Sequence, residues 1–125
     1  MRSSAFFVLL VALACSSPAS EIKDISPQDL LSMSPDSVLI LDVRTPKEFQ
    51  SGHVPQAVNI PLDQLDARLD DLASSQDMPV VVYCERGGRA GKAASLLFQA
   101  GFTDIQHLEG DMSEWRASGR PTATE

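Results

Sequence analysis

The chain has 125 residues, of which 43% are hydrophobic, and a formal net charge of −7. This length and composition supply one modest hydrophobic core, so we expect one folded domain. The ten basic residues do not form the basic face that nucleic-acid binding requires, which sets that class aside. Arg86, Arg89 and Lys92 nevertheless lie within seven positions and predict a small electropositive spot.

The first twenty residues are typical of an export signal followed by a polar tether, so the predicted domain spans residues 21–125. Their apolar run is too short to cross a bilayer, which takes roughly 20 residues. The residues up to Cys15 resemble a bacterial lipoprotein signal, in which this cysteine becomes the lipidated first residue. An ordinary signal would instead be cut near Ala19 or Ser20. Membrane contact is expected only under the first interpretation, through a lipid on Cys15, because an ordinary cut removes this cysteine.

Two helix starts can be recognised in the first half of the predicted domain. Ser26 and Thr45 each precede a proline, and proline is favoured at the first helical position. Glu48 lies three residues after Thr45, which is the spacing of a capping box. Between these starts, the continuous apolar run at 38–41 predicts a strand buried in a parallel sheet.

Strands and helices continue to alternate in the second half. Four leucines recur at helical spacing over 62–72, with aspartates between them, and predict a helix with one buried face. The remaining elements are expected as strands at 57–60, 79–83 and 102–108 and as helices at 89–100 and 111–117. Strands separated by helical crossovers predict an α/β fold with a mostly parallel central sheet and helices on both faces.

Cys84 directly follows the predicted strand at 79–83. An exported protein meets an oxidising compartment, but this cysteine has no disulfide partner inside the predicted domain. His53 and His107 are far from it in sequence, and no metal-binding spacing occurs, so we expect no metal and no cofactor. Two interpretations remain at this point: a reactive thiol, and a buried cysteine that acts as a small hydrophobic side chain.

The residues around Cys84 favour the reactive interpretation. Open α/β sheets place their ligand sites at the carboxyl ends of central strands, where this cysteine is expected. The two following glycines let backbone amides turn inward, and the next helix directs its positive end to the same point. These groups favour an anion, including a thiolate. The candidate binding residues are Arg86, Gly87, Gly88 and Arg89.

Three motifs resemble the rhodanese-like sulfurtransferase family. Residues 41–44 and 48–61 look like the amino-terminal signature of that family, and residues 84–89 match its Cys-x-x-Gly-x-Arg active-site loop. Residues 108–111 with Trp115 look like its carboxyl-terminal segment. The resemblance covers nearly all of the predicted domain. Together with the size and the export signal, it implies a monomeric, single-domain, periplasmic thiosulfate sulfurtransferase.

The resemblance also implies roles for individual residues. The thiolate of Cys84 would attack the outer sulfur of thiosulfate, release sulfite and hold a persulfide until cyanide or a thiol collects the sulfur. Arg89 would stabilise the anionic substrate, with help from Arg86, and Lys92 would steer the donor. Asp42 and Arg44 would support the site by hydrogen bonds in the strand-to-helix turn, as would Glu48. His53 and Trp115 are expected to be structural.

Four residues separate Cys84 from Arg89, as in sulfur-transferring members of the family, whereas the related phosphatases and arsenate reductases have one residue more. A thiol-based phosphatase or arsenate reductase is therefore the less favoured alternative. A persulfide carrier or binding module without turnover is the other. Glu85 departs from the neutral or basic residues that many thiosulfate-using members carry, and we expect it to oppose a dianionic substrate.

Overall fold

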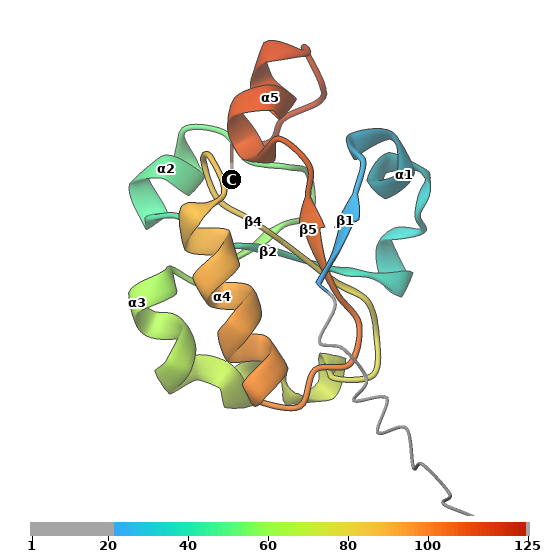
Figure 1. Cartoon of the computed structure of the whole chain (residues 1–125). Coiled ribbons are helices and arrows are strands. Elements are labelled where there is room, and N and C mark those ends of the chain that lie inside the picture. Colours follow the sequence, from blue (N-terminus) through green and yellow to red (C-terminus); the bar gives the residue numbers. More distant parts are fainter. Residues whose placement is uncertain (1–21, 125) are drawn as a thin grey trace, which may run out of the picture.

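Five short strands form one parallel sheet at the centre of this computed structural model, which describes residues 22–124 (Figure 1). The predicted export signal and tether at 1–20 lie outside the described residues. All four strand pairs are parallel, in the order β1-β5-β4-β2-β3. The strands are β1 (Lys23–Ile25), β2 (Leu39–Asp42), β3 (Val58–Asn59), β4 (Val80–Tyr83) and β5 (Ile105–Leu108).

Helices cover both faces of this sheet, as the sequence predicted (Figure 1). One face packs against α3 (Leu62–Leu65), the 3-10 helix η2 (Asp66–Ser75) and α4 (Gly88–Gln99). The other face packs against α1 (Pro27–Ser32) and α5 (Asp111–Ala117). The remaining helices are α2 (Pro46–Gln50) and the 3-10 helix η1 (Pro35–Ser37). Among residues 22–124, each helix is too short or too polar to span a lipid bilayer.

The central strand β4 shows how the two cores are divided. Val80 and Val82 belong to the cluster beneath α4, whereas Val81 and Tyr83 belong to the cluster beneath α5. Successive side chains of a strand point to opposite faces, and all four of these residues are fully buried. A continuous apolar run is therefore what this position requires.

The predicted helix starts are present. The Ser26 side chain accepts a hydrogen bond from the amide of Asp29 at the start of α1. Thr45 and Glu48 form the reciprocal capping box at the start of α2. Both caps satisfy amides that the first helical turn leaves without a partner.

Several elements differ from the prediction, including an unpredicted η1 and a β3 that is shorter than the predicted 57–60. β1 was not predicted, because a three-residue edge strand with only Ile25 buried has too short a pattern to recognise. The helix expected over 62–72 is one α-helical turn followed by η2, and the three-residue steps among its leucines suit a 3-10 helix as well. The strand expected at 102–108 is confined to Ile105–Leu108.

The direction in which the chain adds strands to the sheet reverses at β2 and β4. The chain leaves β2 for β3 on one side and then returns to form β4 on the other side of β2. Ligands of open α/β proteins bind at such a change of direction. Asp42 and Tyr83 are register partners, so the segments that follow these two strands start side by side.

The core on the α4 face supplies a direct test of this packing. Leu97 on α4 is fully buried, whereas Leu31 on α1 is 49% exposed. We expect Leu97→Ala to lower the free energy of unfolding by about 2–5 kcal/mol, because it removes buried methyl groups and leaves a cavity. The control, Leu31→Ala, should change it by at most about 0.5 kcal/mol. Urea denaturation measures both, and equal losses in the two variants would contradict the assigned core.

Candidate active site

Cys84 lies at the end of β4 with its residue surface only 1% exposed. The loop after it curls back, so that the amide of Gly87 donates a hydrogen bond to Sγ at 2.9 Å. The amide of Cys84 itself donates to Oδ1 of Asp111 at 3.0 Å. The sulfur is therefore held by its own loop, in the position where an anionic sulfur would receive a hydrogen bond.

Gly87 has a conformation that only glycine adopts easily. Its φ is +117°, and a Cβ placed there would lie 3.1 Å from Oδ2 of Asp111. Helix α4 begins at the next residue, Gly88, and the amides of its first turn have no helical carbonyl to bind. The turn at Gly87 thus brings the positive end of α4 toward the thiol.

The outer side of the loop is fixed by α5. The amide of Met112 donates to the carbonyl of Cys84, and the amide of Ser113 donates to the carbonyl of Glu85, both at 3.0 Å. Figure 1 shows α5 at the same end of the sheet as the loop that precedes α4. Because the first-turn amides of α5 satisfy these two carbonyls, the loop keeps its carbonyls outward.

Arg89 projects from the first turn of α4 and is held by Glu48 of α2. Two hydrogen bonds join the guanidinium to the carboxylate, at 2.7 and 3.0 Å. The Arg89 guanidinium lowers the pKa of Glu48 to about 2, and the carboxylate in turn raises the pKa of Arg89. The Arg89 side chain remains 36% exposed, so it is anchored at a fixed place and still open to solvent.

The predicted support from Asp42 and Arg44 is present. Nη2 of Arg44 binds Oδ2 of Asp42 at 2.8 Å, and the two side chains are 1% and 0% exposed. The same guanidinium donates to the carbonyl of Gly52 at 2.8 Å and to Oε2 of Glu85 at 3.2 Å. Arg44 therefore joins the turn after β2 to the loop that carries Cys84.

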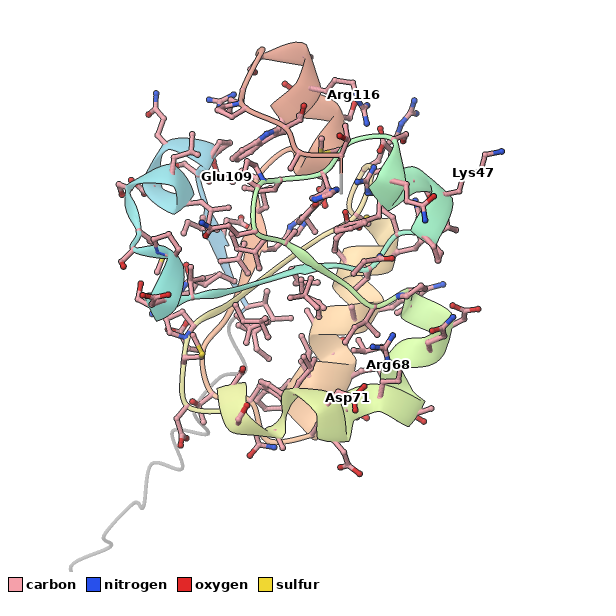
Figure 2. All side chains as sticks on the ribbon, turned by 180° about the vertical axis from the view of Figure 1, so that it is seen from behind. Lys47, Arg68, Asp71, Glu109 and Arg116 are labelled. Carbon is pink, nitrogen blue, oxygen red and sulfur yellow. The ribbon has the colours of Figure 1, made fainter. Side chains whose placement is uncertain are left out.

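Glu85 does not stand as a free negative charge in the loop. Its carboxylate binds Arg116 of α5 at 2.7 Å in addition to Arg44, and chiefly the Arg116 contact lowers its pKa. Figure 2 shows Arg116 on α5, at the end of the molecule opposite the Arg68–Asp71 pair. The two guanidinium groups offset the charge of Glu85, so the repulsion of a dianion expected from the sequence is reduced.

Arg86 and Lys92 differ from the other cations near the loop. Both are exposed, and neither forms an ion pair with any residue in the described part of the chain. Arg86 follows Cys84 by two positions, yet its side chain is not held within the loop. The electropositive spot that the sequence predicted therefore has two parts. The side chains of Arg86 and Lys92 are exposed to solvent, and the side chain of Arg89 is held in place by Glu48.

Two residues close to the thiol were not among the predicted site residues. Asp111 is buried at the start of α5 and accepts the amide proton of Cys84. His107 on β5 places Nε2 2.9 Å from both oxygens of that carboxylate. The motif around Asp111 was recognised in the sequence, but nothing in the motif indicated that its side chain reaches Cys84.

The remaining predicted residues occupy structural positions. His53 is buried, its Nδ1 lies 2.7 Å from the carbonyl of Phe49, and its ring stacks on the Phe49 ring with a centroid distance of 3.6 Å. Trp115 is fully buried in the core, and its indole N–H donates to the carbonyl of Pro121. Within residues 22–124, no group of three or more His, Cys, Asp or Glu side chains is placed to hold a metal ion.

The fold and the loop define a class of protein: an α/β domain that presents one thiol among amides and arginines at the end of a central strand. The model of the rhodanese-like domain matches residues 26–118. The chain belongs to the rhodanese-like domain family, which confirms the resemblance seen in the three motifs.

Known proteins agree with this assignment. The uncharacterized protein YqhL of Bacillus subtilis is 42% identical over 76 residues, which are 61% of this chain and 59% of YqhL. The match thus spans less than two thirds of that relative. The thiosulfate sulfurtransferase GlpE of Pseudomonas savastanoi is 31% identical over 100 residues, which are 79% of this chain and 92% of GlpE. A rhodanese-related protein from Thermoplasma volcanium has a crystal structure with a TM-score of 0.73 at 30% identity, covering 82% of this chain and 99% of that one.

The two glycines of the loop allow a matched test of the site geometry. Gly87→Ala should lower the free energy of unfolding by about 1–3 kcal/mol, because it forces a strained φ and crowds Asp111. Gly88 has open space around its Cα, so Gly88→Ala should be neutral or stabilising by about 0.4–1 kcal/mol. Chemical denaturation of the two variants decides the matter, and a Gly87→Ala protein as stable as Gly88→Ala would refute the described turn.

Proposed function

We propose that this protein is a thiosulfate sulfurtransferase that carries the transferred sulfur on Cys84. The observation that carries the proposal is the ring around Sγ, by which we mean the backbone of the loop at residues 84–89. The Gly87 amide donates to the sulfur at 2.9 Å, and the loop leads directly into the amino terminus of α4. Such a ring suits an anionic sulfur at the end of the cysteine side chain. Family membership and the similarity to a relative named thiosulfate sulfurtransferase support the same activity.

In the first half-reaction, the Cys84 thiolate attacks the outer sulfur of thiosulfate. A sulfur–sulfur bond forms to Cys84, the bond to the inner sulfur breaks, and the electron pair of that bond leaves with sulfite. The total charge is conserved, because a thiolate and a dianion become a persulfide anion and the sulfite dianion. The amide of Gly87 and the free amides at the start of α4 would stabilise the persulfide.

In the second half-reaction, an acceptor removes the outer sulfur. Cyanide would attack it to form thiocyanate, or a thiolate would attack it to form a new persulfide, and the electron pair of the broken bond returns to Cys84. Electrons balance within each half-reaction, so this chemistry requires neither a cofactor nor a metal.

The basic residues near the loop would have different roles toward the anionic donor. Arg89 is held in a fixed orientation by Glu48 and is partly exposed, which suits a guanidinium that receives the sulfonate end of thiosulfate. Arg86 and Lys92 are exposed and without ion-pair partners among residues 22–124, so they would attract the donor from solution. Glu85 would act on the loop through Arg44 and Arg116 and not as a contact of the substrate.

The alternatives named from the sequence predict different kinetics. A persulfide carrier would accept one sulfur and turn over slowly. A phosphatase or arsenate reductase would need a wider ring than the four residues between Cys84 and Arg89 supply. We also propose that the protein acts in the periplasm, on the basis of the export signal predicted at 1–20, and as a monomer, which is the expectation drawn from the family resemblance and the single-domain size.

Steady-state assays with thiosulfate and cyanide test this function, with an aryl phosphate assayed in parallel. We expect turnover with thiosulfate and negligible phosphate hydrolysis. Cys84→Ser should abolish turnover, and Arg89→Lys should lower kcat/KM about tenfold or more, because a lysine cannot keep the two-point contact with Glu48. Arg68→Lys, at the opposite end of the molecule (Figure 2), is the matched control and should keep the natural rate.

Two results would overturn the assignment. Turnover that survives Cys84→Ser would remove the cysteine from the mechanism. Phosphate hydrolysis comparable with sulfur transfer in the natural protein would remove the distinction based on loop length.

A further inference from the structure

Asp111 combines two unfavourable features that call for a compensating contact. It is only 2% exposed, although an aspartate normally stays in water. Its φ is +52°, in the left-handed region that favours glycine. A buried carboxylate in a strained backbone conformation persists where its side chain has specific partners.

The partners of Asp111 are parts of the loop around the thiol. Oδ1 accepts the amide proton of Cys84 at 3.0 Å. Oδ2 lies beside Gly87, so close that a Cβ at that position would be 3.1 Å away. The carboxylate therefore sits directly behind the sulfur-bearing residue and the turn that encloses Sγ, where its charge acts on any anion bound there.

His107 is the hydrogen-bonding partner of this carboxylate, and it is a cationic partner when its ring is doubly protonated. Its Nε2 lies 2.9 Å from both carboxylate oxygens, and its ring is half-buried. On the other side, Nδ1 lies 3.7 Å from Oδ1 of Asp24, whose side chain is 65% exposed. The imidazole N–H on Nε2 donates to Asp111 in both protonation states, but only the doubly protonated ring carries a compensating charge.

The surroundings of His107 contain few other ionisable groups. Its register partner on β1 is Asp24, its partner on β4 is the apolar Val82, and the loop before α4 presents Gly87. The hydrogen bond to Asp111 is the main cause that raises the pKa of His107 above its ordinary value of 6.5. The protonated ring is thus favoured in the folded protein, and its charge is lost as the pH rises through this raised pKa.

We propose that His107 and Asp111 form a charge-tuning pair that makes the reactivity of Cys84 toward anions depend on pH. When His107 is protonated, the pair is neutral. When His107 releases its proton to solvent, the buried carboxylate is left as a net negative charge behind the thiol. The other neighbour of the ring, Asp24, is also a carboxylate and cannot supply the missing positive charge.

The effect of the His107–Asp111 pair on catalysis rests on the proposed function. Thiosulfate is a dianion, and its attack site lies in front of a loop whose rear side becomes negative as the pH rises. The value of kcat/KM for thiosulfate should therefore fall at a pH above the ordinary histidine pKa. The two residues are positioning and charge-setting groups, since neither touches Sγ.

The test compares two alkylating reagents on the full chain and does not depend on sulfur transfer. Iodoacetate is an anion and iodoacetamide is neutral, and both react with the thiolate, so their rate ratio cancels the thiolate fraction. Mass spectrometry of the peptide that contains Cys84 measures both rates across the pH range. We expect the ratio of iodoacetate to iodoacetamide rates to fall about three- to tenfold in the natural protein as His107 loses its proton.

Two variants and one control separate the pair from a merely structural role. His107→Gln should give a ratio that stays low and independent of pH, because the carboxylate is never compensated. Asp111→Asn keeps the shape and should give a higher ratio at every pH, with its fall moved to lower pH because His107 loses the partner that raises its pKa. His53→Gln replaces the other histidine of the chain and should keep the natural profile.

Nuclear magnetic resonance of the His107 ring supplies an independent reading, because its titration midpoint should fall in Asp111→Asn. A rate ratio in His107→Gln that still falls with pH as in the natural protein would overturn the proposal. An unchanged His107 midpoint in Asp111→Asn would overturn it as well. Absence of thiosulfate turnover would instead count against the proposed function alone.

Discussion

The buried guanidinium of Arg44 connects the parts on which the site depends. It binds Asp42 at the end of β2, the carbonyl of Gly52 and the carboxylate of Glu85 beside Cys84. Removing one partner of a buried ion pair costs roughly 3–5 kcal/mol, because the other charge is left in a poorly solvated place. The segments that follow β2 and β4 are therefore held together by a charge network in addition to the sheet itself.

This network continues to both helices that flank the loop. Glu85 also forms an ion pair with Arg116 on α5. The backbone amides in the first turn of α5 bind the carbonyls of the loop. On the other side, Glu48 holds Arg89 on the first turn of α4. Contacts with α4, α5 and the turn after β2 thus fix the shape of the ring around Sγ. These contacts hold the Cys84 thiol in place, although the strand that precedes it has only four residues.

The sequence was sufficient for the elements that have a strong local pattern. The apolar run at Val80–Tyr83, the caps at Ser26 and Thr45, and the interruption at Gly87 each have a local physical cause, and the structure has a strand, two helix starts and a turn at these places. Gly88, which was expected in the interruption, is instead the first residue of α4. The edge strand β1 was not predicted, because three residues carry too little pattern. The split of the helix after Leu65 was not predicted either, because leucine spacing fits both helix types.

The sequence indicated the loop from Cys84 to Arg89, but not Asp111 and His107 beside it, nor the pairing of distant residues around it. Glu48 and Arg89 are 41 positions apart, and Asp111 and Cys84 are 27 positions apart. Such pairs depend on the strand register and on the way the helices cross the sheet. A local sequence pattern predicts neither of these. For the same reason, Glu85 was expected to repel an anion, whereas two arginines from distant segments hold and offset its charge.

In the sulfur transfer that we propose, Cys84 takes the outer sulfur of thiosulfate and passes it on. Thiosulfate labelled with radioactive sulfur at either the outer or the inner position tests it most directly. We expect that only the outer label stays on the protein, that it leaves as thiocyanate when cyanide is added, and that Cys84→Ser retains no label. Retention of the inner label, or labelling of Cys84→Ser to the natural extent, would contradict it.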